Sequence, residues 1–389
     1  MMHAHSYELA ISNRTRSTPY TRRNEEAGVK AYTVYNNMLL PTRFRGDVED
    51  YWHLCEHVQV WDVSCERQIQ VQGPDADRLV QWMTPRDISR AADDQCFYLP
   101  LCDENGRIIN DPVAIRIDRE TWWLSIADSD VELWAKGLAL GAGLDARVEE
   151  RDIWPLAVQG PKSEALMERV FGPEVRSIGF FRYKRLEFKG ALWIVARSGW
   201  SRQGGFEIYV DDASLGRQLW DALFEAGGDL NVGPGCPSLI ERIEGGLLSY
   251  GNDMDARHTP FQCGLDRFCN IDRDLPSMSL EALRQEQARG ADSRLVGLLG
   301  PELEVLPGDT DVYLAGERAG YVTSGSLSAR YSAWLGFAML DSVAIERVKS
   351  EKIPGFTVRT LQGEQALRCS ELPFDFSALE LPLRPRGRS

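Results

Sequence analysis

One stretch of the sequence places a carboxamide and a carboxylate side by side at the entrance to an apolar strand. FYLPLCDENGRIINDP (97–112) carries Tyr98, Asn110 and Asp111. A carboxylate held at such a place can accept a proton from a bound ligand. An aspartate that precedes a proline is also a common turn-former, so this stretch alone leaves both interpretations open.

A second stretch groups a carboxylate with aromatic side chains around a diglycine turn. ARSGWSRQGGFEIYVDD (196–212) contains Trp200, Glu207 and Tyr209. In a strand, Glu207 and Tyr209 point to the same face, because alternate residues share a face. The competing interpretation is that Glu207 pairs with Arg197 and that Trp200 is a core aromatic residue.

A third stretch, IERIEGGLLSYGNDMDARHTPFQCGL (240–265), bunches charges on an otherwise apolar element. Its polar residues include Arg242, Glu244, Tyr250 and Asp253. Taken singly, each stretch is better explained by structural roles, since charged and aromatic residues are common in turns. Their occurrence together favours a binding site.

Composition narrows the class of ligand. The 389 residues include 44 basic and 58 acidic side chains, and the net charge of −14 opposes general attraction to nucleic acid or to anionic membranes. No apolar run approaches the roughly 18 residues of a membrane-spanning helix. The N-terminus lacks the apolar core of a secretory signal. We therefore expect a cytoplasmic protein with a small-molecule substrate, and a homodimer is a possible assembly.

The cysteines and histidines do not predict a metal site. The eight cysteines are scattered without zinc-ligand spacing, so we expect reduced structural thiols. His53 and His57 lie one helical turn apart, but no third ligand type converges on them in the sequence. Neither a Ser/His/Asp arrangement nor a phosphate loop is found.

The elements that must position these residues alternate between helical and strand patterns, which predicts an α+β protein. Two segments, 67–83 and 156–172, share an apolar strand, a Gln-Gly-Pro turn and a helix, which indicates two similar lobes. Short strands with glycine-rich turns follow residue 290 and predict a β domain. We expect disordered ends at 1–16 and 381–389 and three domains, at 17–150, 151–288 and 289–380.

Four motifs in order carry a resemblance to a known family. HVQVWDVSCERQIQVQGPDA (57–76) precedes the three stretches above, and GYVTSGSLS (320–328) comes late. Over roughly residues 18–340 the chain resembles the aminomethyltransferase family typified by the glycine-cleavage T-protein. The resemblance implies three domains in a cloverleaf-like arrangement, with a barrel-like C-terminal domain and tetrahydrofolate in the central hole.

The resemblance also implies roles for individual residues. Tyr98 and Glu207 fall where the family contacts the folate, and a carboxylate suits the donor edge of a pterin. Asp111 falls on the carboxylate regarded as catalytic. We also take Trp200, Arg197 and Arg242 as candidates for cofactor binding.

Departures from the family pattern point to a narrower branch. Asn110 replaces the first aspartate of a pair, Cys65 replaces a histidine, Trp200 replaces a tyrosine, and Ser238 stands where the family has a folate-tail arginine. Several phrases, including KAYTVYNNMLLP and LLSYGNDM, are similar to the dimethylsulfoniopropionate demethylase branch. That branch moves a methyl group from a sulfonium to N5 of tetrahydrofolate, without a metal.

The implied reaction suggests how the site treats its donor. A sulfonium is a cation that favours aromatic faces, so Tyr32, Tyr35, Trp200 and Tyr209 are candidates for substrate binding. A neutral Asn110 beside the catalytic carboxylate could orient a ligand without adding charge.

Other activities remain open at this stage. They are O-demethylation of methoxyaromatic compounds, demethylation of another sulfonium or a quaternary ammonium compound, aminomethyl transfer in glycine cleavage, and folate binding without catalysis.

Overall fold

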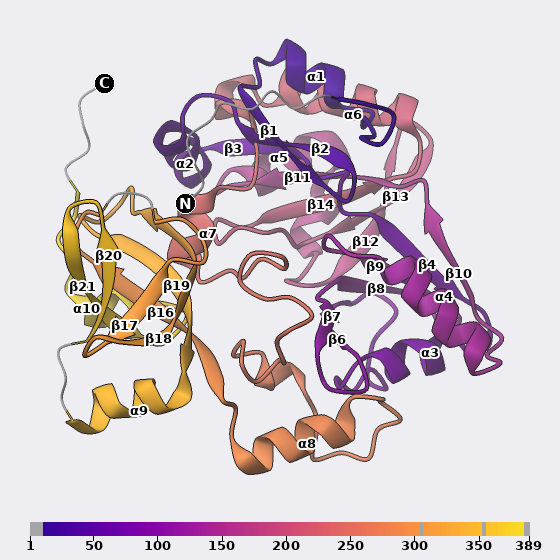
Figure 1. Ribbon diagram of the computed structural model, residues 1–389. Coiled ribbons are helices and arrows are strands. Elements are labelled where there is room, and N and C mark those ends of the chain that lie inside the picture. Colours follow the sequence, from indigo (N-terminus) through magenta and orange to yellow (C-terminus); the bar gives the residue numbers. More distant parts are fainter. Residues whose placement is uncertain (1–10, 304–305, 352–354, 385–389) are drawn as a thin grey trace.

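The computed structural model describes residues 11–303, 306–351 and 355–384. Figure 1 shows two sheet-and-helix units beside one another and a barrel formed by the C-terminal part of the chain. The strands of the two units are interleaved along the chain, because β3 (Val58–Asp62) lies in the first 150 residues yet pairs with β11 (Trp154–Gln159). The domain boundaries expected at 150 and 288 stay a prediction.

The first sheet has five antiparallel strands in the order β10-β4-β9-β8-β5. Their bounds are β4 Gln68–Gln72, β5 Cys96–Tyr98, β8 Val113–Asp118, β9 Thr121–Ser125 and β10 Arg147–Arg151. Helices α3 (Ala76–Met83) and α4 (Val131–Gly141) pack on one face. Ile69 and Val71 of β4 point into this core, as the alternation in the sequence predicts.

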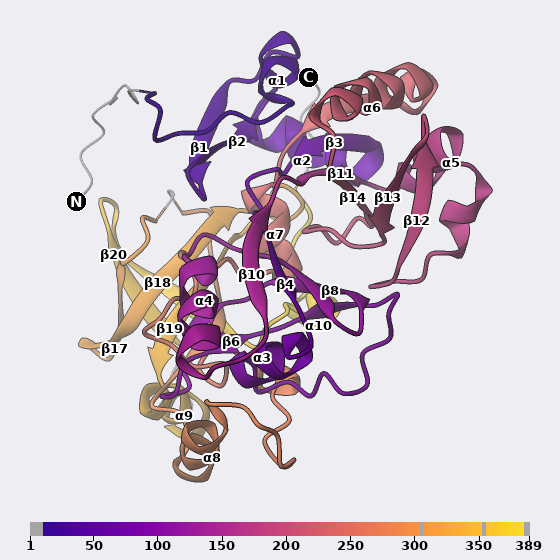
Figure 2. The ribbon, with the colours of Figure 1, turned by 90° about the vertical axis from the view of Figure 1, so that its right-hand side faces the viewer.

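The second sheet has six strands in the order β12-β13-β14-β11-β3-β15. Its further strands are β12 Tyr183–Phe188, β13 Ala191–Ala196, β14 Gly205–Val210 and β15 Val232–Gly235. Helices α5 (Ser163–Phe171) and α6 (Ala213–Ala226) cover its outer face (Figure 2). The apolar stripe of α6 puts Leu219, Trp220 and Leu223 into that core.

The two repeated segments fold as the same strand-turn-helix unit. In both, the glycine of Gln-Gly-Pro has a positive φ, +138° at Gly73 and +121° at Gly160. A Cβ at Gly73 would lie 2.4 Å from the carbonyl oxygen of Asp145, and one at Gly160 would lie 2.4 Å from that of His57. Each helix can therefore start close to a neighbouring backbone only because the residue is glycine.

The inner faces of the two sheets pack against each other. Ile115 of the first sheet and Ile194 and Tyr209 of the second belong to one cluster, with Trp123 against it. Side chains of β14 thus alternate between the helix-covered core, which takes Phe206, and this seam. Glu207 lies on the seam side with Tyr209, as the sequence predicts.

The remaining elements flank the two sheets. They are α1 Thr21–Glu26, β1 Ala31–Tyr35, β2 Met38–Arg43, α2 Asp47–Glu56, β6 Leu101–Cys102, β7 Ile108–Asn110, α7 Leu239–Gly245, α8 Leu280–Arg289, and the 3-10 helices η1 Pro173–Ser177, η2 Gly228–Leu230 and η3 Asp266–Phe268. β1 pairs with β2, and β6 pairs with β7.

The C-terminal part forms a closed barrel in the order β16-β19-β18-β17-β20-β21, which confirms the predicted β domain. Its elements are β16 Ser293–Gly300, β17 Asp311–Leu314, β18 Glu317–Leu327, β19 Trp334–Asp341, α9 Ser342–Glu351, β20 Phe356–Thr360, β21 Gly363–Ser370 and α10 Phe376–Leu379. The α+β class and the three-part arrangement are likewise as expected.

The ends expected to be disordered fall partly outside the described residues. Residues 1–10 and 385–389 are not described. Within the described part, the Arg16 backbone amide donates to the Asn37 carbonyl, and the Arg384 side chain pairs with Glu302 at 2.8 Å.

We predict that Gly160→Ala destabilises the fold more than Gly190→Ala does. Both glycines have a positive φ, but a Cβ at Gly190 has no neighbour within 4 Å, so only Gly160 adds a backbone clash. The clash should cost about 1–3 kcal/mol beyond the strain that the two variants share. Urea unfolding measures both variants, and equal losses would contradict this account of the turn.

Candidate active site

Asp111 is positioned by the end of a short strand and by a tyrosine from the first sheet. It follows β7 directly and precedes Pro112. The hydroxyl of Tyr98, the last residue of β5, donates to its Oδ2 at 2.9 Å. Asp111 stays partly accessible, yet burial raises its pKa to about 7. A carboxylate with this pKa can hold or release a proton near neutral pH.

Asn110 is fully buried, and its amide is used within the protein. The amide nitrogen donates to the Ala127 carbonyl at 3.0 Å and to Ser129 Oγ at 2.8 Å. Its oxygen accepts from the Ala127 backbone amide at 3.1 Å. These contacts fix the end of β7 to the turn after β9. They therefore also fix the backbone position of the next residue, Asp111.

Glu207 faces a second buried carboxylate across the seam between the sheets. Ser198 donates a short hydrogen bond to Glu207. Ser125 of β9 donates to Glu66 Oε2 at 3.2 Å. Burial and the neighbouring Glu207 raise the pKa of Glu66 to about 8, and burial also raises the pKa of Glu207. The two groups repel each other as anions, so ionisation of one disfavours ionisation of the other.

No cation neutralises these three carboxylates in the part of the chain that the structure describes. Asp111, Glu66 and Glu207 form no ion pair there, although most carboxylates buried this deeply need one. Burial raises the pKa of each of the three, so the fold favours their protonated forms.

Two tyrosines of the N-terminal hairpin have raised pKa values. Burial raises the pKa of Tyr35, and the negative charges of Asp111 and Glu66 raise it further. Burial raises the pKa of Tyr32 to about 12, with smaller effects from Glu25 and Asp62. Its hydroxyl is buried without a hydrogen-bond partner.

Arg242 joins the third stretch to the barrel. It is buried and pairs with Asp253 Oδ2 at 2.7 Å, and its other terminal nitrogen donates to Ser324 Oγ of β18 at 2.7 Å. The guanidinium also lies over the rings of Trp200, at 5.7 Å, and Phe337, at 5.9 Å. Its polar contacts are thus made within the protein, and Trp200 is held against it.

Arg197 is not brought together with Glu207. Its side chain pairs with Glu164 of α5 at 3.0 Å and lies 5.3 Å from the centroid of the Phe206 ring, on the helix-covered side of the sheet. The ion pair with Glu207 considered from the sequence is therefore wrong. The register explains the difference, because Glu207 and Phe206 are consecutive and point to opposite faces.

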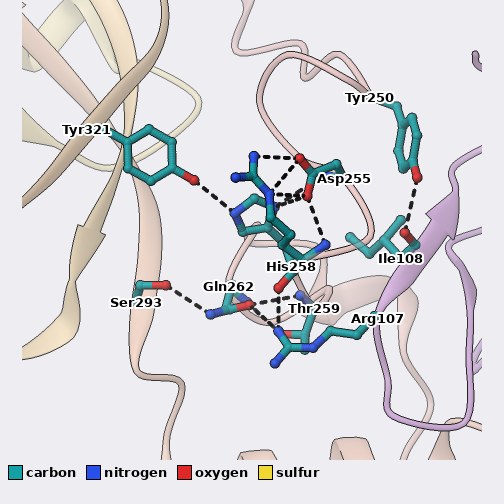
Figure 3. A network of polar contacts seen from close by, with 10 residues as sticks. Arg107, Ile108, Tyr250, Asp255, His258, Thr259, Gln262, Ser293 and Tyr321 are labelled. Atoms are coloured by element: carbon teal, nitrogen blue, oxygen red, sulfur yellow. Dashed lines mark hydrogen bonds and ion pairs between the residues drawn. The ribbon is translucent and has the colours of Figure 1, made fainter. Parts of the chain in front are cut away.

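The loop after α7 ties the strand of Asp111 to the barrel (Figure 3). The backbone carbonyl of His258 accepts a hydrogen bond from the backbone amide of Ile108, in β7, at 2.9 Å. The Tyr250 hydroxyl donates to the Ile108 carbonyl at 3.4 Å. On the other side, His258 Nε2 and the Tyr321 hydroxyl of β18 are 3.1 Å apart. The position of Asp111 thus depends on all three parts of the fold.

Sequence reasoning missed Glu66, Ser125 and Ser198. The one available signal was a carboxylate, Glu66, between two strands that are almost wholly buried, 58–62 and 68–72. A solvated turn would give the same pattern. The two serines carry no signal in the sequence, because only the packing of the sheets brings them to the carboxylates.

Metal and membrane features were searched in the same residues. Across the described ranges, no group of three or more His, Cys, Asp or Glu side chains could hold a metal ion. His53 and His57 have ring centroids 5.2 Å apart, and Lys162 Nζ lies 2.9 Å from His57 Nδ1. No helix of the described chain is long and apolar enough to cross a bilayer.

Comparison with known proteins identifies the family. Residues 20–273 match the GCVT N-terminal domain, and residues 294–375 match the glycine cleavage T-protein C-terminal barrel domain. The chain therefore belongs to the glycine-cleavage T-protein family of aminomethyltransferases. A crystal structure of the glycine cleavage system aminomethyltransferase T from Bartonella henselae has the same fold, with a TM-score of 0.81 and 22% identity over 92% of this chain and 97% of that one.

Sequence relatives extend this result to the narrower branch. The chain is 50% identical over 332 residues to the dimethylsulfoniopropionate demethylase DmdA of Ruegeria pomeroyi, which covers 85% of this chain and 90% of that protein. An aminomethyltransferase of Desulfitobacterium hafniense is 27% identical over 317 residues, covering 80% of this chain and 86% of that protein. The resemblance predicted from the motifs is confirmed.

We predict that Asp111→Asn stabilises the fold at pH 8 but not at pH 4. The folded pKa of about 7 lies above the ordinary value of 3.8, so the carboxyl favours folding below pH 3.8 and loses this contribution as the pH rises through 7. An amide cannot ionise, so the gain at pH 8 should be on the order of 1–4 kcal/mol.

Asp255→Asn is the matched control for this measurement. Although burial acts to raise the pKa of Asp255, hydrogen bonds from Arg257 lower it, so the substitution should destabilise the fold at pH 8. Urea unfolding at both pH values measures the two variants. A loss of stability in Asp111→Asn at pH 8 would show that the ionised form is favoured by the fold.

Proposed function

We propose that the protein is a tetrahydrofolate-dependent demethylase that transfers a methyl group from dimethylsulfoniopropionate to N5 of tetrahydrofolate. The products are 3-methylthiopropionate and 5-methyltetrahydrofolate. The relative of 50% identity supports this donor, and the family supports a folate co-substrate.

The observation that carries the proposal is a group of carboxyl side chains at the centre that no cation neutralises. Asp111, Glu66 and Glu207 lie there without a cationic partner among the described side chains, and their pKa values are raised. A bound sulfonium would favour their ionised forms, whereas a neutral methoxyaromatic donor would not. Aminomethyl transfer is disfavoured by the loss of the first aspartate at Asn110.

In the proposed reaction, the methyl group passes from sulfur to N5 of tetrahydrofolate. The S–CH3 bond breaks with its electron pair going to sulfur, which leaves as a neutral thioether and needs no acid. The N5 lone pair forms the new N–CH3 bond, and the N5 proton must then leave. We assign Asp111 as its acceptor, since its carboxylate is held by Tyr98 and has a pKa of about 7.

The other candidate residues are assigned roles according to the groups that they contact. Glu207, which accepts from Ser198, is assigned to the donor edge of the pterin, and Tyr98 borders the folate beside Asp111. Asn110 is a positioning residue, because its amide holds the end of β7.

The aromatic side chains are assigned to the sulfonium. Tyr35 and Tyr209 approach the carboxylates, and a desolvated cation over an aromatic ring gains on the order of 2 kcal/mol. Trp200 and Tyr32 are also assigned to the sulfonium. Arg242 acts by holding Trp200.

The proposal includes a cytoplasmic location, with a homodimer as a possible assembly. Cell fractionation and analytical ultracentrifugation of the full chain would test these two statements separately from the reaction.

A donor panel tests the reaction. The purified protein and tetrahydrofolate are incubated with dimethylsulfoniopropionate, glycine betaine or a methoxybenzoate, and 5-methyltetrahydrofolate is measured. We expect product from the sulfonium alone. Product from the methoxybenzoate and none from the sulfonium would overturn the electrostatic argument, and product from glycine betaine alone would redirect it to quaternary ammonium donors.

We predict that Asp111→Asn lowers kcat by about 10²–10⁴-fold, the usual contribution of a general base. In the unaltered protein, kcat/KM should rise with pH through about 7, because only the carboxylate can accept the proton. The variant should lose this rise while its Kd for tetrahydrofolate stays within about twofold. Retention of both the rate and the pH dependence would exclude Asp111 as the proton acceptor.

A further inference from the structure

The turn 198–205 positions two of the residues that the proposed function assigns to ligands. It lies between β13 and β14 and contains Trp200, and Glu207 follows it in β14. Ser198, at the start of the turn, donates a short hydrogen bond to Glu207. The indole nitrogen of Trp200 donates to the Leu248 carbonyl at 3.3 Å. The positions of Trp200 and Glu207 therefore depend on how this turn is held.

One buried side chain from a neighbouring strand spans this turn. Gln159, the last residue of β11, has no exposed surface. Its amide nitrogen donates to the Ser198 carbonyl at 3.1 Å and to the Phe206 carbonyl at 3.5 Å. Its amide oxygen accepts from the Ser201 hydroxyl at 2.8 Å. One amide thus contacts the turn at its start, in its middle and just beyond its end.

The sequence of the turn leaves room for this amide. A Cβ at Gly199 or at Gly205 would overlap the side-chain amide of Gln159, so a larger residue at either position would displace it. The backbone amide of Gly160 donates to the Gly204 carbonyl at 2.8 Å, which fixes the turn to the residue after Gln159. The glycines at 199 and 205 thus allow Gln159 to lie inside the turn.

The repeated unit of the first sheet shows that the motif alone does not require this arrangement. Gln72 occupies the same place in the first Gln-Gly-Pro turn as Gln159 does in the second, and Gln72 is exposed. The side-chain hydrogen bonds recorded for Gln72 join it to Gln70 at 3.2 Å and to Thr121 at 3.5 Å, and neither residue belongs to the candidate site. A glutamine that serves only the turn can therefore stay on the surface. Gln159 is instead buried against the residues that hold Glu207.

A second buried side chain holds the tip of the turn. Glu241 Oε1, from α7, accepts from the Arg202 backbone amide at 2.8 Å and from the Gln203 side chain at 3.1 Å. Glu241 is 3% exposed, so these hydrogen bonds are shielded from water. The tip of the turn is therefore fastened to α7, while Gln159 holds the end from which Ser198 reaches its carboxylate partner.

We propose that Gln159 is a positioning residue for the folate co-substrate. Its amide fixes the backbone of Ser198, the hydroxyl of Ser198 orients the Glu207 carboxylate, and Glu207 binds the donor edge of the pterin. The last of these steps rests on the proposed function, whereas the first two are contacts within the protein. Gln159 contacts neither substrate and acts through the other two residues.

Folate binding measured without the methyl donor tests this role. Isothermal titration gives the Kd of tetrahydrofolate and the number of binding sites for the unaltered protein and for Gln159→Met, which keeps the length of the side chain and removes its amide. We expect the Kd to rise about three- to tenfold, because the buried Ser198 carbonyl loses its donor and the residue can shift. The number of sites should stay the same, whereas a variant that merely unfolds would lose sites and keep its Kd.

A double-mutant cycle shows whether the effect passes through Glu207. Glu207→Gln alone should raise the Kd about ten- to a hundredfold, because charge-assisted hydrogen bonds to the pterin are lost. The variant that carries both Gln159→Met and Glu207→Gln should have the Kd of Glu207→Gln, since no carboxylate remains to be oriented. If the two effects multiply instead, Gln159 acts independently of Glu207 and the proposal is wrong.

Gln72→Met is the matched control, because it makes the same substitution at the corresponding residue of the first unit. It should leave the Kd of tetrahydrofolate unchanged. Ser201→Ala is a second variant for the case in which Gln159→Met does not fold. It removes the hydrogen bond to the amide oxygen of Gln159 and should raise the Kd about two- to fourfold, and only where Glu207 is present.

Each result decides the proposal. An unchanged Kd in Gln159→Met, or in Ser201→Ala where the first variant is unfolded, would overturn it, and so would the same rise in Gln72→Met. An unchanged Kd in Glu207→Gln would overturn both the assignment of Glu207 and the role of Gln159. If folate binds in the expected pattern but the sulfonium gives no methylated product, the proposed donor fails and the positioning role stands.

Discussion

The central constraint on this structure is the burial of carboxylates without cations to neutralise them. Asp111, Glu66 and Glu207 all have pKa values raised by burial, and the side-chain hydrogen bonds recorded for them come from hydroxyl groups of tyrosine and serine. Hydroxyl donors hold a carboxylate in place without removing its charge. The fold therefore accepts a cost in stability at its centre, which is expected where a site must favour a cation over a neutral ligand.

The fold offsets this cost through the elements around the site. Apolar helix-covered cores on the outer faces of both sheets hold the sheets rigid, so their inner faces can carry polar groups. The buried pair of Arg242 and Asp253 shows the contrast, because there the charges are matched and the pair fastens the third stretch to the barrel. The matched pair has a structural role, whereas the carboxyl groups without a cationic partner are the ones assigned to the ligands.

Much of this arrangement could be predicted from local patterns. The alternation in GFEIYV placed Glu207 and Tyr209 on one face, and the repeated Gln-Gly-Pro turns predicted two similar units. These features depend on neighbours within a few residues. The order of the motifs indicated the family, and the family implied the three-part fold and a candidate catalytic stretch.

Features that depend on contacts between distant segments could not be predicted. The sequence gives no sign that Glu66 meets Glu207, because the two are 141 residues apart and meet only when the inner faces of the sheets pack. Arg197 was misplaced for a related reason, since its neighbour on the helix side, Glu164, comes from α5. The hydrogen bonds of Asn110 to residues 127–129 could likewise not be predicted, because the turn after β9 brings those residues to it.

The positions of Glu207 and Asp111 also bear on the proposed reaction. A methyl transfer between two bound molecules needs sulfur, carbon and nitrogen in line, and correct alignment can contribute about 7–11 kcal/mol. In the proposed reaction, Glu207, held by Ser198, binds the donor edge of the pterin, and Asp111, held by Tyr98, lies at N5. Two contacts to one rigid ring system limit the directions in which N5 can move. Asp111 is then the one carboxylate assigned to N5 itself, where it accepts the proton.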